Sequence, residues 1–92
     1  MTGEVRHDAD GREFQRELDG SRAVLQYELS GGVMSILHTR VPDAIGGRGI
    51  AAELTGAALR HARAAGWKVR PLCSYAAAYL RKHVEYEDLL AQ

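Results

Sequence analysis

The chain has 92 residues, 46% of them hydrophobic, and a formal net charge of zero. This length predicts one domain, residues 1–92, near the small end of what folds without disulfides or metals. The lone cysteine, Cys73, excludes an internal disulfide, and the four histidines lack metal-ligand spacing, so we expect no metal site. No apolar run resembles a targeting segment or could cross a bilayer, so we expect a cytoplasmic protein without a membrane partner.

The charged residues are unevenly distributed along the chain. Between Leu54 and Val84 there is no acidic residue, but there are six basic ones: Arg60, Arg63, Lys68, Arg70, Arg81 and Lys82. Such a block favours a polyanionic ligand, although a solvated basic face gives the same pattern. We do not expect nucleic acid as that ligand, because no aromatic residues are interleaved with the basic ones.

The first forty residues are predicted to form an antiparallel meander. Strands are expected over residues 4–8, 12–18, 23–29 and 33–41, with Asp-Gly or Ser-Gly-Gly turn signals between them. Residues 23–29 alternate apolar and polar side chains, as in a half-buried strand. Residues 33–41 carry apolar side chains on both faces, which predicts a strand covered on both sides.

After Pro42 the apolar period changes and predicts a helix over residues 49–65 that ends at Gly66. A short strand over residues 67–72 follows, then a second helix over 75–83 capped by Ser74, and a last turn over 85–90. Because a helix connects strands 33–41 and 67–72, these strands should be parallel, with a right-handed crossover. The predicted fold class is therefore α/β, an antiparallel sheet extended by one parallel strand, with two main helices.

The glycine-rich segment Gly46-Gly47-Arg48-Gly49 precedes the first helix. It lacks the Ser, Thr, Asp or Asn that normally caps a helix, and Arg48 lies at the positive end of the helix dipole. Missing Cβ atoms let a ligand approach the free N–H groups of a helix start. The segment therefore predicts a phosphate or pyrophosphate site. A flexible turn before a helix is the simpler alternative.

Two common phosphate-binding motifs do not explain this segment. No Gly-Lys-Ser/Thr follows the glycines, which excludes a P-loop. Residues 47–52 match the Gly-x-Gly-x-x-Ala form of the dinucleotide fingerprint. That fingerprint also needs an acidic residue after the next strand and a parallel sheet before the loop. Neither is expected here, so nicotinamide binding is disfavoured.

The order of strands, glycine loop, helix, strand and helix resembles the GNAT superfamily of acyl-CoA-dependent N-acetyltransferases. Residues 44–49 align with its loop pattern Gln/Arg-x-x-Gly-x-Gly/Ala, with Ala44 at the first position. The chain resembles a subfamily of very short GNAT-like proteins more closely than it resembles the superfamily as a whole. The sequence motifs of that subfamily correspond here to His38-Thr39-Arg40-Val41-Pro42, Gly47-Arg48-Gly49-Ile50-Ala51, Pro71-Leu72-Cys73-Ser74-Tyr75 and His83-Val84-Glu85-Tyr86. Val84 stands where the subfamily usually has proline.

This resemblance implies a single small GNAT-like domain that binds acetyl-CoA. The strands over 33–41 and 67–72 would splay apart at their C-terminal ends, helped by Pro71, to admit the pantetheine arm of coenzyme A. The arm would bond to the backbone near Thr39, Arg40 and Val41. The pyrophosphate would lie on the N–H groups of Gly46, Gly47, Arg48, Gly49, Ile50 and Ala51. Arg48 and one or both of Arg81 and Lys82 would balance phosphate charge, and the sequence leaves that choice open.

The resemblance also suggests which residues take part in catalysis. Cys73 would lie near the acetyl thioester, although a small buried side chain is the ordinary role of a free cysteine. His38 is either the general base for an amine or a hydrogen-bonded sheet histidine. Tyr79, four residues after Tyr75 on one helix face, would contact the cofactor and protonate its thiolate, or simply pack. His61 and His83 are assigned to solvated surfaces.

The predicted function is transfer of an acetyl group from acetyl-CoA to an amine acceptor. The chain lacks the extra N-terminal elements that form the acceptor pocket in larger members of the family. The acceptor, a small molecule or a protein, is therefore not defined, and a partner subunit in a homo-oligomer could complete its site. The alternative is a non-catalytic CoA-binding or regulatory module in which Cys73 and His38 are structural.

Overall fold

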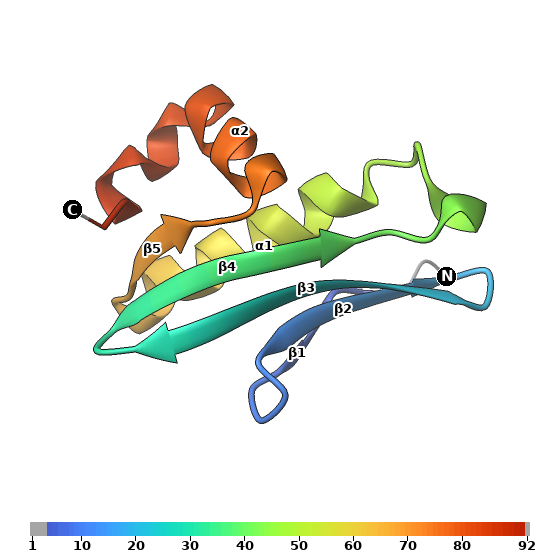
Figure 1. The fold of residues 1–92 in the computed structure, drawn as a ribbon, viewed down its shortest axis with the longest axis horizontal. Coiled ribbons are helices and arrows are strands. Elements are labelled where there is room, and N and C mark those ends of the chain that lie inside the picture. The colour runs from blue at the N-terminus through green and yellow to red at the C-terminus, as the bar shows by residue number, and fades with distance from the viewer. Residues whose placement is uncertain (1–3, 92) are drawn as a thin grey trace.

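The computed structural model describes residues 4–91, which form one small α/β domain (Figure 1). The elements in chain order are β1 (Arg6–Asp8), β2 (Glu13–Leu18), β3 (Ser21–Ser30), β4 (Val33–Arg40), the 3-10 helix η1 (Asp43–Ile45), α1 (Ile50–Ala65), β5 (Lys68–Pro71), α2 (Ser74–Lys82) and the 3-10 helix η2 (Val84–Leu89).

The strands form one five-stranded sheet in the order β1-β2-β3-β4-β5. The first four strands pair antiparallel, and β4 pairs with β5 in parallel through the crossover helix α1. Figure 1 shows α1 behind the sheet, with α2 and η2 beside β5. The predicted fold class, meander and parallel last strand are confirmed.

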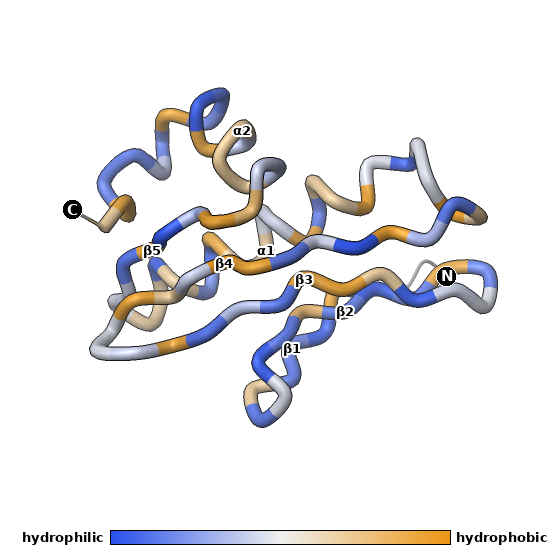
Figure 2. Tube along the Cα trace, in the orientation of Figure 1, coloured by the Kyte–Doolittle hydropathy of each residue, from blue (hydrophilic) through white to orange (hydrophobic). Residues whose placement is uncertain are grey.

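The core lies between the sheet and the helices. Most of its fully buried side chains come from β3, β4, α1 and β5 and include Leu25, Met34, Ile36, Leu54, Leu59 and Val69, and the side chains of Ile45 in η1 and Ala76 in α2 are fully buried too. Figure 2 shows apolar residues recurring along these elements, as their alternating and helical periods require. The opposite face of β4, with Val33 and Leu37, is only partly buried. The prediction that this strand is covered on both sides is therefore wrong, because α1 covers only one face.

Several predicted element boundaries shift by one residue or more. The strand predicted over 67–72 is shorter and runs from Lys68 to Pro71. Cys73, not Ser74, is the N-cap of α2, with extended backbone angles. The predicted last turn is the 3-10 helix η2, after which Leu90 forms a parallel bridge to Val69. The C-terminal segment thus covers part of the outer edge of β5.

Candidate active site

The pairing of β4 with β5 stops halfway along β4. The last paired residues are Ile36 and Pro71, whereas β4 continues to Arg40. The carbonyl oxygen of Ile36 accepts hydrogen bonds from the N–H groups of both Leu72 and Cys73, each at 3.0 Å. Because β5 turns away at this carbonyl, a wedge opens between the two strands, and the predicted splay is present.

The cause of the splay differs from the one expected. The Lys68 N–H donates to Gly32 and the Leu72 N–H to Ile36, so alternation along β5 directs the nitrogen of Pro71 toward the opposite edge. The missing N–H of Pro71 therefore removes no hydrogen bond between β5 and β4. A β-bulge in β4 contributes to the splay instead. Gln26 pairs with His38 and Tyr27 pairs with Ile36, which leaves Leu37 as an extra residue that bends β4.

The wedge is a groove of about 540 Å³ between the end of β4 and the start of α2. Its lining includes His38, Thr39 and Arg40 from β4 and Leu72, Cys73 and Ser74 from the other side. The structure therefore brings both predicted catalytic residues, His38 and Cys73, into one groove with two of the predicted pantetheine contacts. These residues are more than thirty positions apart in the sequence.

The thiol of Cys73 is surrounded by hydrogen-bond donors. Its sulfur lies 3.6 Å from the hydroxyl oxygen of Thr39 across the wedge. Partial burial alone would raise the pKa of this thiol. The backbone N–H groups of Ala76 and Tyr75 and both the hydroxyl and backbone of Thr39 outweigh that effect and lower the pKa below its ordinary value. A cysteine at the N-cap of a helix is well placed to exist as a thiolate.

The imidazole of His38 is exposed at the mouth of the same groove. Within residues 4–91 it has no hydrogen-bond partner, so it is not the hydrogen-bonded sheet histidine that was one of its two interpretations. It remains free to accept a proton from a molecule that enters the wedge.

The glycine loop leaves open space at the start of α1. Gly47 and Gly49 have positive φ angles of 76° and 75°, and a Cβ built on either would meet no atom within 4 Å. Gly49 is the N-cap, no side chain from residues 4–91 caps the helix, and the first-turn N–H groups have no intrahelical acceptor. This arrangement suits a phosphate group. The N–H of Gly46, however, is already bonded to the carbonyl of Asp43, so Gly46 offers no free donor.

Core packing or an ion pair restricts the other residues that were predicted to contact the cofactor. Ile50 is buried in the core and can offer only its backbone N–H. Val41 is partly buried against the core, and Ala51 is half-buried. Arg48 lies on the exposed side of the loop and forms an ion pair with Asp19 at 2.8 Å. Such an exposed pair is worth about 0–1 kcal/mol, which a bound phosphate could readily replace.

A second, narrower groove separates α1 from α2. It is lined by Ala52, Tyr75, Ala78, Tyr79, Lys82 and His83 and has a volume of about 230 Å³. Tyr79 lines this groove rather than the one that contains Cys73. Burial, followed by the nearby Tyr86, raises the pKa of Tyr79. Lys82 faces this groove, whereas Arg81 lies on another side of α2.

The two histidines assigned to solvated surfaces are partly buried in aromatic clusters. His83 stacks on Tyr79 with ring centroids 3.8 Å apart. His61 packs edge-on against His7, at 4.3 Å, and against Trp67, at 5.0 Å. The surface assignment is wrong for both, because the ring of Tyr79 covers His83 and the rings of His7 and Trp67 cover His61.

Part of the basic block is paired within the molecule. Arg63 bonds to both the backbone of Glu85 and the carboxylate of Asp88, and Lys68 donates to the carbonyl of Asp88. These residues attach η2 to α1 and to the start of β5. The block is thus only partly available to a polyanionic ligand, a limitation that the linear charge pattern could not reveal.

The five-stranded sheet splits between the bulged strand β4 and its parallel neighbour β5, and a glycine loop precedes α1. This combination defines the GNAT class of fold. A model of the GCN5-related N-acetyl-transferase family matches residues 13–89, and the chain belongs to this family. This finding confirms the resemblance inferred from the motifs. Among the described residues, no helix is long and apolar enough to span a membrane, and no cluster of three or more metal-ligating side chains occurs.

Similar proteins include small vertebrate ones and a bacterial one. Protein NATD1 from Homo sapiens is 40% identical over 82 residues, covering 86% of this chain and 73% of NATD1. Protein NATD1 from Danio rerio is 36% identical, covering 89% and 79%. The NMR solution structure of a GCN5-like protein from Staphylococcus aureus aligns with a TM-score of 0.75 and 28% identity, covering 96% of this chain and 87% of that one.

Proposed function

We propose that this protein binds acetyl-CoA and transfers its acetyl group to an amine. The observation that carries the proposal is the wedge, where the Cys73 thiol and the His38 imidazole line one groove beside backbone groups of β4 that β5 leaves unpaired. Such free backbone groups suit the amide-rich pantetheine arm, since each one needs a hydrogen-bond partner when covered. Family membership supports the same chemistry.

The parts of the cofactor are assigned along the site in order. The pyrophosphate lies on the N–H groups from Gly47 to Ala52, where no Cβ blocks the approach at either glycine of positive φ. The pantetheine arm follows the backbone from Val41, just after β4, to Thr39 within it, and the thioester lies near Cys73. The 3′-phosphate is assigned to Lys82, because its side chain faces the groove between α1 and α2, next to the helix start.

The reaction is a direct acyl transfer. The uncharged amine attacks the thioester carbonyl, a C–N bond forms, the C–S bond breaks, and the electron pair leaves with the sulfur of CoA. His38 accepts the proton lost by the amine nitrogen. The departing thiolate takes up a proton from water, since Tyr79 lines the neighbouring groove. Positioning the two reactants in the wedge supplies much of the rate enhancement.

Cys73 lines the wedge in this mechanism and is not acylated. Hydrogen-bond donors around its sulfur lower the pKa of this thiol and so favour the thiolate. A stabilised thiolate is also a good leaving group, which makes a thioester on Cys73 easy to lose. The direct route needs no such intermediate.

Intact-mass spectrometry of the purified protein with acetyl-CoA tests the proposal. We expect a noncovalent CoA complex under native conditions, no added acetyl group on Cys73 after denaturation, and acetylation of an added amine such as a lysine peptide or spermidine. Retention of CoA without any acetylated product, over a panel of small amines and protein lysines, would favour a non-catalytic CoA-binding module. Absence of CoA binding would reject both functions.

A further inference from the structure

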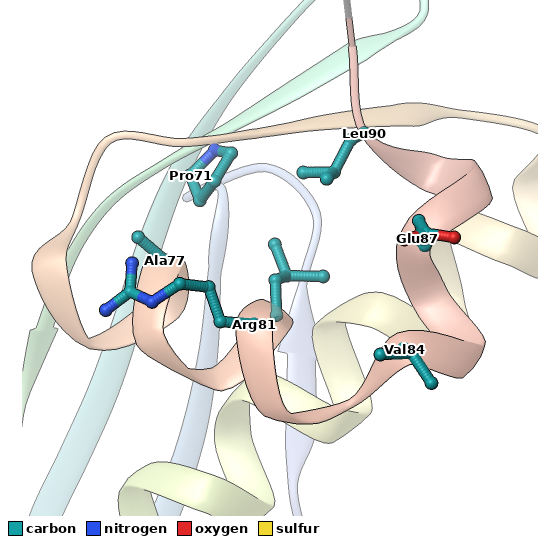
Figure 3. Close-up of a pocket in the computed structure, with 7 residues that line it drawn as sticks. Pro71, Ala77, Arg81, Val84, Glu87 and Leu90 are labelled. Carbon is teal, nitrogen blue, oxygen red and sulfur yellow. The ribbon is translucent and has the colours of Figure 1, made fainter.

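A further cavity lies away from the proposed active site, between α2, η2 and the end of β5 (Figure 3). Its volume is about 460 Å³, and apolar side chains of Pro71, Ala77, Leu80, Val84 and Leu90 line it. Val84 is 67% exposed, although removing a valine side chain from water is favourable. The apolar cavity and the exposed valine together form a surface that favours being covered.

Two opposite charges border this cavity. Arg81 extends from α2 and Glu87 from η2, and Figure 3 shows them on opposite sides of the cavity. Both residues are exposed, and within residues 4–91 neither forms an ion pair or hydrogen bond through its side chain. Asp88, the neighbour of Glu87 on η2, differs because it forms an ion pair with Arg63 of α1. The two unpaired charges therefore favour a partner with the reverse arrangement.

We propose that this cavity is a homodimer interface, in which the same surface of a second copy of the chain packs about a twofold axis. A twofold axis places each residue of one surface opposite a different residue of the same surface, so Arg81 of one copy can meet Glu87 of the other, twice. Val84 of each copy then enters the apolar cavity of its partner. The surface carries one charge of each sign, which makes it complementary to itself rather than to a strongly charged partner.

The dimer forms through side chains rather than by extension of the sheet. The outer edge of β5 offers few free groups, because Ala91 already donates to the carbonyl of Val69 and Pro71 has no N–H. A strand from another molecule could make few ladder hydrogen bonds there. The contact must therefore rest on the apolar cavity and its two charged neighbours.

The interface leaves the proposed active site open. Tyr79 and Lys82 face the groove on another side of α2, and Cys73 lies at the beginning of that helix. Dimerisation through the α2–η2 surface does not depend on the proposed acetyl transfer.

Sedimentation velocity over a concentration series tests the proposal with charge-reversal variants. We expect the wild-type protein to dimerise. Arg81→Glu and Glu87→Arg each place like charges opposite one another at both contacts, and each should weaken the dimer about tenfold or more. An equimolar mixture of these two variants restores both opposite-charge contacts, so it should form heterodimers as tight as the wild type. Glu85→Arg makes the same charge change on an exposed part of η2 outside the cavity and should leave dimerisation unchanged.

Both reversed residues are exposed, so circular dichroism should report a folded chain for each variant. A wild-type protein that stays monomeric across the concentration series would overturn the proposal. So would single variants that dimerise like the wild type, or a mixture that fails to associate. In these cases the surface either stays open or takes a partner other than a second copy.

Discussion

The hydroxyl oxygen of Thr39 lies 3.6 Å from the sulfur of Cys73, and this contact joins β4 to the start of α2 across the wedge. It links the two sides of the groove at the level where β4 and β5 are no longer paired. It also helps to lower the pKa of the thiol, together with the backbone N–H groups at the start of α2. The contact thus bears on both the shape of the groove and the charge of its sulfur.

Replacing Thr39 should make the thiol less acidic. Thr39→Val keeps the shape of the side chain but removes the hydroxyl, so the pKa of Cys73 should rise, and alkylation by iodoacetamide near neutral pH should slow about threefold. Thr39→Ser retains the hydroxyl and is the matched control. The rate of alkylation against pH gives the pKa directly. Equal profiles for Thr39→Val and Thr39→Ser would mean that the hydroxyl does not act on the thiol.

Removing the thiol should slow the reaction without abolishing it. Under direct transfer, Cys73→Ala lowers kcat but still binds acetyl-CoA, and Cys73→Ser behaves like alanine because neither variant offers a thiolate beside the thioester. Steady-state kinetics with both substrates varied should show intersecting lines, as expected for a ternary complex. Ping-pong kinetics with an acetyl group on Cys73 that passes quantitatively into product would contradict direct transfer. A fully active Cys73→Ala would reduce this residue to packing and leave His38 as the chemical group.

Glycines in the loop should control cofactor binding. Gly49→Ala places a methyl group where a phosphate oxygen approaches, so the affinity for CoA should fall at least about tenfold. Gly32 is a matched control, because its φ angle of 77° is close to the 75° of Gly49 and neither has an atom within 4 Å of a built Cβ. Both substitutions should cost about 1–2 kcal/mol of folding stability through left-handed strain. Calorimetric titration should show weaker CoA binding only for Gly49→Ala, and equal affinity of the two variants would remove the loop from the site.

Lys82 rather than Arg81 should recognise the 3′-phosphate of CoA. Lys82 faces the groove between α1 and α2, whereas Arg81 borders the other cavity. Lys82→Ala should weaken CoA binding about tenfold and leave the binding of dephospho-CoA unchanged, because the lost contact involves only that phosphate. Arg81→Ala should bind both ligands like the wild type. Wild-type affinities that are equal for CoA and dephospho-CoA would exclude any 3′-phosphate contact by Lys82.

Folding stability should decrease below about neutral pH because of His7. Its Nε2 atom lies 2.6 Å from the hydroxyl of Tyr27, and its ring stacks on Phe14 at 4.2 Å. Burial, and then the nearby His61, lower the pKa of His7 from its ordinary value of 6.5. The unfolded chain therefore binds the proton first as pH falls. The contribution of neutral His7 is complete above pH 6.5 and is lost as pH drops from there toward the folded-state pKa.

Thermal melting of His7→Gln alongside the wild type measures this contribution. The variant should be less stable at high pH, and its difference in Tm from the wild type should shrink as pH falls below 6.5. Comparing the two proteins cancels the titration of other groups. His61→Gln removes the second cause of the shift and should give a smaller pH dependence than the wild type. A difference in Tm that is constant with pH would show that His7 contributes by packing alone.

Local signals in the sequence determined the order of the elements and the family. Pairs such as Asp19-Gly20 suit tight turns, since both residues adopt positive φ here. The helical period over residues 50–65 and the left-handed cap Gly66 depend on neighbouring residues only. The glycine loop and the sequence motifs around His38 and Cys73 are also local patterns. A linear pattern was therefore enough to predict the sheet, the crossover and the residues that meet in the wedge.

Only the tertiary structure decided the orientation of individual groups. The direction of the Pro71 nitrogen depends on the register of β5 against β4, and a shift of one residue would reverse it. The assignment of Lys82 and Arg81 to different grooves depends on how α2 is rotated against α1. The contact of His7 with His61 joins the first strand to the C-terminal half of α1. Register and rotation are set by packing between residues far apart in the chain, and for that reason no local pattern contains them.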